Sequence, residues 1–479
     1  MKNLVSIFGG HDANITFFNG QYHIIEIERL LKKRYTGLYT VDVNLKDEEI
    51  VGILQECQDI ATKFWGIEND YECVLINSQW KKPKSLIENV FKSDKYLTLT
   101  NHHYTHAYSA FYQSPYKEAL ILSYDGGGEK EYFNFYSGNS NGIILLNKIP
   151  INMGVGYWRS ASLIKQITKR SKTRRSYPGK LMGLAGYGTI NEKLLPHLRQ
   201  FFTTRDGKIL DMIQSGNYYQ GNGGKNLAAT IQKTIEDILF EELDKYDTQI
   251  PLVVTGGCAL NVIINEKIKD RYGRKVYVPP NPNDGGLSLG HMFCYQKPIE
   301  RVDVRYNGLP LLDKDELSGY NVKKVTKKEI AELIKDGKII GLVYGDSEVG
   351  PRALGNRSIV CDPSIADMKD ILNSKVKHRE SYRPFAPFCK KEDAHKYFES
   401  RDFDNMECMS FAVKVKVDTL PSITHVDGTA RLQTVTEESH PHFYELLTEF
   451  GKISDTNVLL NTSFNSRGKP ILSTISDAV

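Results

Sequence analysis

The stretch Ala119-Leu120-Ile121-Leu122-Ser123-Tyr124-Asp125-Gly126-Gly127-Gly128-Glu129 joins an apolar run to a carboxylate and three glycines. The run at 119–123 predicts a buried β-strand, and Asp125 then stands at the end of that strand. Glycines after such a strand let a phosphate approach the backbone closely. This stretch therefore predicts a nucleotide-binding loop at one edge of a β-sheet.

Two histidines lie upstream of this strand, in the segment Asn101-His102-His103-Tyr104-Thr105-His106. On a helix, the spacing of four places His102 and His106 on one face. Together with the carboxylate of Asp125, their two nitrogens would leave open positions on a divalent metal. A histidine pair taken alone is more often part of an ordinary packed helix, so that interpretation stays open.

Two further strands end in similar loops. The apolar run at 251–255 leads into a double glycine at 256–257 and then into Asn261, and this pattern usually brings the backbone close to a nucleotide. The strand at 276–278 leads into a loop that contains Asp284. Two histidines with two aspartates would favour iron(II), manganese or magnesium over structural zinc.

The first thirty residues predict three strands, at 4–8, 15–18 and 22–27, with a glycine turn after the first. Such an opening occurs in actin-like ATPase folds and also elsewhere. His11 follows that turn. A neutral histidine there could take a proton from a hydroxyl group, although a turn-capping role explains it equally well. Residues 48–64 carry apolar side chains at helical spacing and predict a packed helix.

We place a domain boundary in the looser segment at 296–314 and expect a second α/β unit after it. A helix is predicted at 329–337 and a buried strand at 339–344. Tight loops rich in arginine or polar side chains follow at 350–358, 377–387, 429–434 and 461–465. Because the guanidinium fork binds phosphate oxygens bidentately, such loops favour a phosphorylated ligand over ordinary salt bridges.

The length of 479 residues implies two or three domains, and 40% hydrophobic with 25% charged residues indicates a soluble, globular protein. Seven cysteines without a CxxC pair indicate neither a disulfide framework nor a zinc knuckle, and they favour a reducing cytoplasm. No membrane span is predicted. Residues 1–8 are too soon followed by glycine to be a signal peptide.

A net charge of +4 is weak support for a polyanionic partner. The stretch at 165–180, however, contains seven basic residues and no acid: Lys165, Lys169, Arg170, Lys172, Arg174, Arg175 and Lys180. A solvated loop is the first interpretation of this stretch. An electrostatic footprint for an anionic acceptor is the second.

Taken together, these segments resemble the O-carbamoyltransferase family, which contains aminoglycoside, cephem and nodulation-factor carbamoyltransferases. The similar segments follow one another along nearly the whole chain, at 9–13, 26–29, 102–106, 125–129, 180–188, 256–261 and 284–286, and in the four loops of the second unit. The resemblance implies an α/β protein with two catalytic domains. Residues 1–300 would form an actin-like ATPase domain of two RNase H-like halves, and residues 315–479 a YrdC-like domain.

The resemblance also implies a reaction. Carbamoyl phosphate would bind to the second domain and be converted to carbamate. ATP would then adenylate the carbamate in the first domain, and the carbamoyl group would pass to an acceptor hydroxyl on a metabolite sugar, or on a hydroxymethylated nucleobase or DNA. An unstable carbamate needs a dry path between the sites, which explains why two domains would share one chain.

Individual roles follow from the same resemblance. His11 would be the base that acts on the acceptor hydroxyl. An iron(II)-like metal, with magnesium or manganese as alternatives, would bind to His102, His106, Asp125 and Asp284. The nucleotide would contact Gly126, Gly127, Gly128, Gly256, Gly257 and Asn261. Carbamoyl phosphate would contact Arg352, Arg357, Lys377, Arg383, Arg431, Asn461 and Ser463.

Some features depart from the family. The basic cluster at 32–34 stands where relatives usually have arginine and lysine near the nucleotide, the stretch at 165–180 is longer and more basic than usual, and relatives generally continue beyond Val479. A threonylcarbamoyl-type tRNA-modifying enzyme is an alternative that the modest net charge disfavours. An actin-like nucleotide-binding regulator is another, which leaves the C-terminal arginine loops unexplained. An oligomer is compatible with the sequence.

Overall fold

The computed structural model describes residues 2–39, 45–99, 101–128, 132–169, 171, 173–216 and 220–479. Glu129, Arg170 and Lys172, which belong to the motifs quoted above, lie outside these residues. The described part of the chain has no helix that is both long enough and apolar enough to span a membrane. All seven cysteines are described, and none forms a disulfide.

The first of three mixed sheets contains five strands in the order β3-β2-β1-β4-β5. Its strands are β1 (Asn3–Phe8), β2 (Asn14–Phe18), β3 (Tyr22–Glu26), β4 (Tyr71–Asn77) and β5 (Tyr96–Leu99). β1, β2 and β3 form an antiparallel meander, while β4 and β5 run parallel to β1. The predicted third strand ends one residue early, because Ile27 begins the short helix α1 (Ile27–Leu30).

The second sheet repeats this plan, with the order β10-β9-β6-β7-β8. Its strands are β6 (Ala119–Tyr124), β7 (Phe133–Asn139), β8 (Gly142–Ile149), β9 (Leu252–Thr255) and β10 (Val276–Tyr277). A meander again comes first, and two strands parallel to β6 follow. The shared strand order and directions confirm the predicted α/β fold with two similar halves, although the sequence itself shows no internal repeat.

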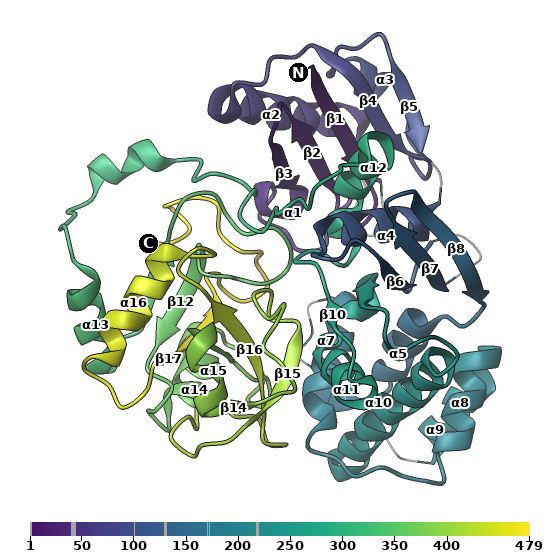
Figure 1. Ribbon diagram of the computed structural model, residues 1–479, viewed down its shortest axis with the longest axis vertical. Helices are drawn as coiled ribbons and strands as arrows, with labels where there is room; N and C mark the ends of the chain where they lie inside the picture. The colour runs from purple at the N-terminus through teal and green to yellow at the C-terminus, as the bar shows by residue number, and fades with distance from the viewer. Residues whose placement is uncertain are drawn as a thin grey trace.

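Helices cover these two sheets. The first sheet packs against α2 (Asp47–Trp65), as predicted, and the short α3 (Ser85–Glu88) lies nearby. Between β8 and β9 the chain forms a helical insertion, seen at the lower right of Figure 1. The insertion consists of α5 (Met153–Ala161), α6 (Lys165–Thr168), the 3-10 helix η1 (Arg174–Ser176), α7 (Tyr177–Ala185), α8 (Leu195–Thr204), α9 (Gly207–Ser215) and α10 (Gly221–Leu243).

Two helices are exchanged between the halves. α4 (His102–Gln113) follows the first sheet in the chain but packs on the second, where Phe111 and Ile121 share a core. α12 (Leu287–Gln296) follows the second sheet but packs on the first, where Met292 is buried with Leu4. The two helices cross closely, because a Cβ at Gly290 would lie 2.4 Å from the backbone oxygen of Thr105.

The third sheet has seven strands in the order β11-β12-β17-β13-β16-β15-β14. They are β11 (Ile340–Val343), β12 (Arg357–Cys361), β13 (Ala386–Lys390), β14 (Phe398–Glu399), β15 (Phe411–Val415), β16 (Thr429–Val435) and β17 (Val458–Ser463). Only the β13–β16 pair among these is parallel. One face is covered by α13 (Lys327–Lys335) and α16 (Pro441–Gly451).

The other face of the third sheet packs against the helical side of the second (Figure 1). One continuous apolar core includes Leu181 of α7, Ile264 of α11 (Val262–Tyr272) and Phe411 of β15. A buried ion pair also joins the two units, with Lys180 Nζ 2.6 Å from Glu380 Oε1. The remaining elements are short: η2 (Gly257–Leu260), η3 (Asp284–Gly286), η4 (Lys314–Gly319), α14 (Met368–Ile371), the π-helix η5 (Leu372–Val376), η6 (Lys391–Asp393) and α15 (Ala394–Tyr397).

Candidate active site

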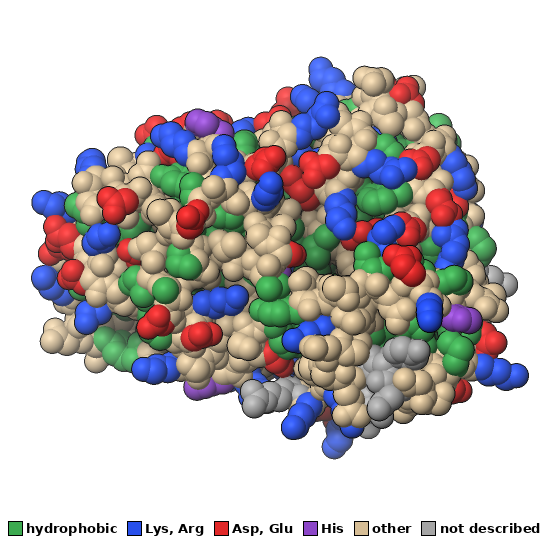
Figure 2. Space-filling view, turned by 90° about the horizontal axis from the view of Figure 1, so that it is seen from below, with side chains coloured by type: hydrophobic (Ala, Val, Ile, Leu, Met, Phe, Trp, Pro, Cys, Tyr) green, Lys and Arg blue, Asp and Glu red, His purple; other side chains and the backbone are tan. Residues whose placement is uncertain are grey.

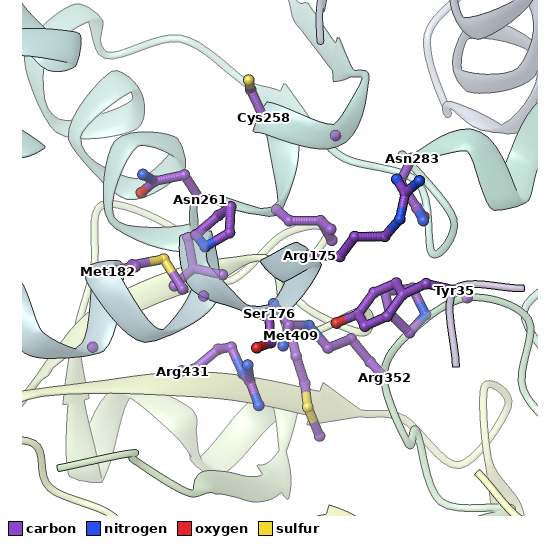
Figure 3. Close-up of a pocket in the computed structure, with 18 of the residues that line it drawn as sticks. Tyr35, Arg175, Ser176, Met182, Cys258, Asn261, Asn283, Arg352, Met409 and Arg431 are labelled. Carbon is purple, nitrogen blue, oxygen red and sulfur yellow. The ribbon is translucent and has the colours of Figure 1, made fainter. Parts of the chain in front are cut away.

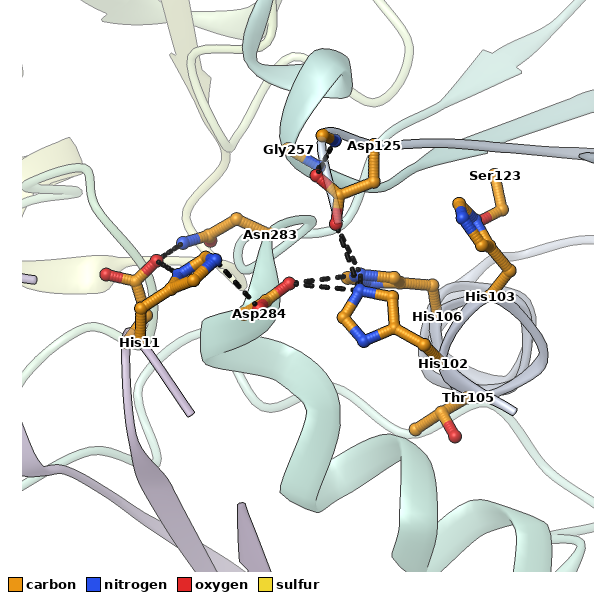
Figure 4. A network of polar contacts seen from close by, with 12 residues as sticks. His11, His102, His103, Thr105, His106, Ser123, Asp125, Gly257, Asn283 and Asp284 are labelled. Atoms are coloured by element: carbon orange, nitrogen blue, oxygen red, sulfur yellow. Dashed lines mark hydrogen bonds and ion pairs between the residues drawn. The ribbon is translucent and has the colours of Figure 1, made fainter. Parts of the chain in front are cut away.

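His102, His106, Asp125 and Asp284 meet where the two N-terminal halves join (Figure 4). His102 Nε2 lies 3.1 Å from Asp125 Oδ2, and His106 Nε2 lies 3.3 Å from the same oxygen. Each of these nitrogens is also 3.4 Å from Asp284 Oδ1. All four residues are buried. The helical spacing of the histidines and the two strand ends thus bring the four predicted ligands together.

Backbone groups aim the side chain of Asp125. Its Oδ1 accepts hydrogen bonds from the backbone N–H of Gly126, at 2.6 Å, and of Gly257, at 3.2 Å. Its Oδ2 therefore faces the two histidines. α4 begins at His102 because the side chain of Asn101 caps it, accepting from the N–H of Tyr104 at 3.0 Å.

The donor set is suited to a divalent metal. Ligand atoms about 2.1 Å from one ion lie about 3.0–3.4 Å apart. The His–Asp separations of 3.1–3.4 Å fit that range, and the four ligand atoms all lie within 4.8 Å of one another. Two imidazoles and two carboxylates leave coordination positions open for a substrate.

The cluster also favours positive charge. Burial lowers the pKa of His102, but the carboxylates of Asp284 and Asp125 outweigh it and raise that pKa to about 10. Burial raises the pKa of Asp125, yet its contacts with the two histidines hold it well below its usual range. Both carboxylates are thus anionic, and a cation among the four side chains would be stabilised.

His11 lies beside this cluster at the wall of a cavity. Its Nδ1 is 3.1 Å from Asp12 Oδ2, and its Nε2 is 3.3 Å from Asp284 Oδ2. Burial lowers the pKa of His11, but Asp284 and then Asp12 raise it to about 9. A cation bound to Asp284 would remove most of that carboxylate's influence and leave His11 closer to a neutral base.

The cavity has a volume of about 1060 Å³ and is lined by both units (Figure 3). From the N-terminal halves it takes His11, Asp125 and Asp284, and from the third sheet and its loops the side chains predicted to bind carbamoyl phosphate. Five of those seven line it: Arg352, Arg383, Arg431, Asn461 and Ser463. The two predicted binding regions thus share one cavity.

The predicted nucleotide residues divide into two groups. Gly126, Gly127, Gly257 and Asn261 line the cavity. Gly128 and Gly256 do not, and both have positive φ, of 108° and 89°. A Cβ at Gly256 would lie 2.2 Å from the backbone oxygen of Tyr124, so this glycine permits a close approach of two chains.

The arginines of the third unit gather at one end of the cavity. Burial lowers the pKa of Arg352 to about 10, with Arg383 and Arg34 adding to the effect. Burial also lowers the pKa of Arg431, and the charges of Arg352, Arg379 and Arg383 lower it further. Guanidinium groups that repel one another in a shielded space would bind a multiply charged anion strongly.

Arg357 and Lys377 do not line the cavity. Arg357 is fully buried at the start of β12 and donates to the backbone oxygens of Tyr344, at 2.6 Å, and Gly345, at 2.9 Å. The Lys377 amine donates to the backbone oxygen of Ser463 and, at 2.8 Å, to Asn465 Oδ1. Both side chains hold the loops that carry the lining residues.

Several lining cations were not assigned to the site from the sequence: Lys33, Arg34, Arg174, Arg175 and Arg379. Arg379 stands in one of the quoted loops, and the others belong to the two basic segments that depart from the family pattern. The stretch at 165–180 is accordingly more than a solvated loop. Lys169 is exposed, but Arg174 and Arg175 face the cavity and Lys180 is buried in its ion pair.

The fold is mixed α/β, and one cavity is lined by both of its units. The carbamoyltransferase N-terminus family model matches residues 52–292, and the carbamoyltransferase C-terminus model matches residues 331–479. The chain belongs to the carbamoyltransferase family and is a transferase.

Three named relatives are similar to this chain in sequence. The chain is 33% identical to the nodulation protein NolO of Bradyrhizobium diazoefficiens, over 79% of this chain and 75% of that protein. It is 33% identical to the nodulation protein NolNO of Sinorhizobium fredii, over 80% of this chain but 61% of the relative. It is 30% identical to the 3'-hydroxymethylcephem-O-carbamoyltransferase of Amycolatopsis lactamdurans, over 65% of this chain and 63% of that protein.

Among solved structures, the chain is similar to full-length HypF in a phosphate- and nucleotide-bound form. The TM-score is 0.39 at 13% identity, over 62% of this chain and 55% of HypF. At this level of similarity the fold assignment rests on the strand topology described above.

Proposed function

We propose that the protein is an ATP-dependent O-carbamoyltransferase that makes a carbamoyl adenylate and transfers its carbamoyl group to an acceptor hydroxyl. The observation that carries the proposal is the single cavity, which has His11 and the two aspartates of the metal-type cluster in one part and the arginine cluster in another. Membership of the carbamoyltransferase family is the reason for proposing that the transferred group is a carbamoyl group. The chain matches only about 61–63% of the length of two of the named relatives, so the complete activity is part of the proposal.

In this proposal, residues 315–479 form the carbamoyl-phosphate domain. Arg352, Arg383 and Arg431 bind the phosphate, while the polar side chains at the end of β17, Asn461 and Ser463, line the same end of the cavity. Water hydrolyses carbamoyl phosphate to phosphate and carbamate. Because one cavity joins the two parts of the site, carbamate has a short path from one part to the other.

Residues 1–300 form the adenylation and transfer domain. ATP lies against the loops that carry Gly126, Gly127, Gly257 and Asn261. A carbamate oxygen attacks the α-phosphorus of ATP, and pyrophosphate leaves. His102, His106, Asp125 and Asp284 would hold a divalent cation, for which we propose iron(II), magnesium or manganese; when bound, it neutralises phosphate charge and polarises the carbonyl group.

Transfer then uses His11. The acceptor oxygen forms a bond to the carbamoyl carbon, the bond from that carbon to the AMP oxygen breaks, and His11 takes the hydroxyl proton. Asp12 holds Nδ1 of the imidazole, at 3.1 Å, so the proton goes to Nε2, which in this structure lies 3.3 Å from Asp284 Oδ2. We expect the protein to be located in the reducing cytoplasm.

A pyrophosphate assay tests the proposal. Purified protein should release pyrophosphate only when both ATP and carbamoyl phosphate are present, and removal of either should reduce the rate to background. ATP turnover that is indifferent to carbamoyl phosphate would refute the proposal. Support of pyrophosphate release by threonine and bicarbonate, in place of carbamoyl phosphate, would point to the threonylcarbamoyl reaction instead.

A further inference from the structure

We infer that the acceptor carries an anionic group, a phosphate or a carboxylate, and that Arg174 and Arg175 of η1 bind it. The inference rests on the proposed function, because it concerns the substrate whose hydroxyl group is carbamoylated. Fold and family leave that substrate undecided. The side chains around His11 carry chemical information of their own.

Arg175 lies close to the group that would act on the acceptor. It lines the cavity together with His11, and the two side chains interact electrostatically. In Figure 3 the Arg175 side chain extends toward Asn283. Asn283 donates to Asp12 Oδ2 at 3.2 Å, and that same oxygen contacts His11. An acceptor hydroxyl that reaches His11 therefore brings the rest of its molecule near Arg175.

The backbone of η1 holds both arginines in place. Thr173 Oγ1 accepts from the N–H of Arg175 at 3.3 Å, and Ser176 Oγ donates to the Thr173 oxygen at 2.8 Å. The Trp158 indole donates to the Arg174 backbone oxygen at 3.0 Å. Arg174 is exposed and Arg175 is partly buried, so the pair runs from solvent into the cavity.

These two charges are separate from the arginine cluster that the proposed function already uses. They come from the helical insertion of the second half, whereas Arg352, Arg383 and Arg431 come from the third unit. A phosphate or carboxylate offers two oxygens to the fork of a guanidinium group, whereas a neutral sugar offers no charge to it. The cavity of about 1060 Å³ has room for a small acceptor beside an adenylate.

A small anionic acceptor also agrees better with the surface than a nucleic acid does. On the face shown in Figure 2, the described basic and acidic side chains are interspersed over both units. A protein that follows a nucleic-acid backbone usually presents a basic stripe along its path. Part of the basic stretch at 165–180 instead borders the cavity, because Arg174 and Arg175 line it.

The first experiment identifies the acceptor's class. Protein, ATP and ¹³C-labelled carbamoyl phosphate are incubated with an equimolar pool of nucleosides, nucleoside monophosphates, sugars, sugar phosphates, hydroxy acids and duplex DNA. Products are separated by anion exchange and analysed by mass spectrometry. We expect the label on anionic small molecules, with kcat/KM at least about tenfold above that of each neutral counterpart. Phosphatase treatment of the product distinguishes a phosphate from a carboxylate.

The second experiment tests the two arginines. Arg175→Gln should lower kcat/KM for the anionic acceptor about 10- to 100-fold, mainly through KM, and by at least tenfold more than it lowers pyrophosphate release. Arg174→Gln should act in the same direction more weakly, and Arg175→Lys should retain part of the transfer. The control is Lys169→Gln, which removes an equal charge from an exposed position of the same stretch outside the cavity.

The outcomes separate the two proposals. Absence of pyrophosphate release from the unmodified protein contradicts the proposed function itself. Pyrophosphate release with the label on neutral sugars, on nucleosides or on DNA, or with no label on any anionic member, overturns only the present inference. Equal losses of pyrophosphate release and transfer in Arg175→Gln would also overturn it, because Arg175 would then serve the nucleotide.

Discussion

Asp125 uses its two carboxylate oxygens for different purposes. One accepts from the backbone N–H groups of Gly126 and Gly257, and the other faces His102 and His106. Gly126 and Gly257 thus orient the side chain of Asp125, and both also line the cavity. The sequence predicted Asp125 as a ligand from its place at a strand end, but the aim of each oxygen depends on a loop 132 residues further along.

Replacement of this aspartate should abolish metal binding. In Asp125→Asn, an amide NH₂ group can take the place of the oxygen that faces the histidines, and an NH₂ group cannot bind a cation. We expect about one divalent ion per chain in the unmodified protein and at least tenfold weaker retention in the variant, measured by inductively coupled plasma mass spectrometry after dialysis. Asp303→Asn, at a surface ion pair with Arg305, is the control. Equal metal content in both variants would contradict the assignment.

His11 should be needed for transfer and not for adenylation. His11→Asn keeps a polar side chain beside Asp12 but removes the base, so transfer should fall about 10²- to 10⁴-fold. Pyrophosphate release that depends on ATP and carbamoyl phosphate should persist. Both rates can be followed in one reaction, with His197→Asn on the exposed face of α8 as the control. Loss of both half-reactions would assign His11 to the nucleotide instead.

Among the helices, α16 has an N-cap whose hydrogen bonds depend on pH. His440 caps α16: its Nδ1 accepts from the N–H of Phe443 at 3.2 Å, so Nε2 carries the proton and donates to Asn356 Oδ1 at 2.9 Å. Both bonds require the neutral imidazole. Burial accordingly lowers the pKa of His440 to about 4.

Stability should therefore fall in mild acid. Because the folded-state pKa of His440 is lower than the unfolded value of about 6.5, its contribution is complete above that pH and is lost as the pH falls through about 4. The loss amounts to at most about 3 kcal/mol. His440→Asn, which can still cap the helix, should flatten this part of the curve. Urea denaturation at pH 7.5 and 4.5 measures the effect, with the exposed His442→Asn as control; parallel curves for the wild type and His440→Asn would refute it.

Most elements could be predicted from local patterns, and their pairing could not. The helix at 48–64 and the strand at 119–123 appear as α2 and β6 because apolar spacing reflects the face that each buries. α10 begins at Gly221, although the glycines and asparagine of its first turn give no apolar signal in the sequence. The repeated strand order of the two halves has no counterpart in the residue pattern.

In the whole molecule, the site exists because the units pack in one particular way. Phosphate binding by Arg352, Arg383 and Arg431 is a prediction from their loops and the family resemblance. Their position across a cavity from His11 could not be predicted, because it depends on the apolar core that joins α7 and α11 to β15. Lys180 could be seen only as a member of a basic stretch, yet it forms a buried pair with Glu380 of the other unit.

Breaking this pair should destabilise the protein strongly. Lys180→Met removes the ion-pair partner of the buried Glu380 and should cost about 3–5 kcal/mol, measured by chemical denaturation. The double variant Lys180→Met/Glu380→Met should recover much of the loss, because no uncompensated charge remains. Lys414→Met, which removes one partner of an exposed ion pair with Glu399, is the control. Equal stability of Lys180→Met and the unmodified protein would show that the pair contributes nothing.

The exchanged helices affect the order in which the chain can fold as it is synthesised. The strands of the first sheet are complete once residue 99 has been made, and α2 can cover one face at once. The opposite face, with Leu4 and Leu75, is covered by Met292 of α12. A ribosome must therefore deliver the entire second sheet and its helical insertion before that face is closed. Until then, the nascent first half exposes an apolar surface, and this is the stage at which a chaperone would be needed most.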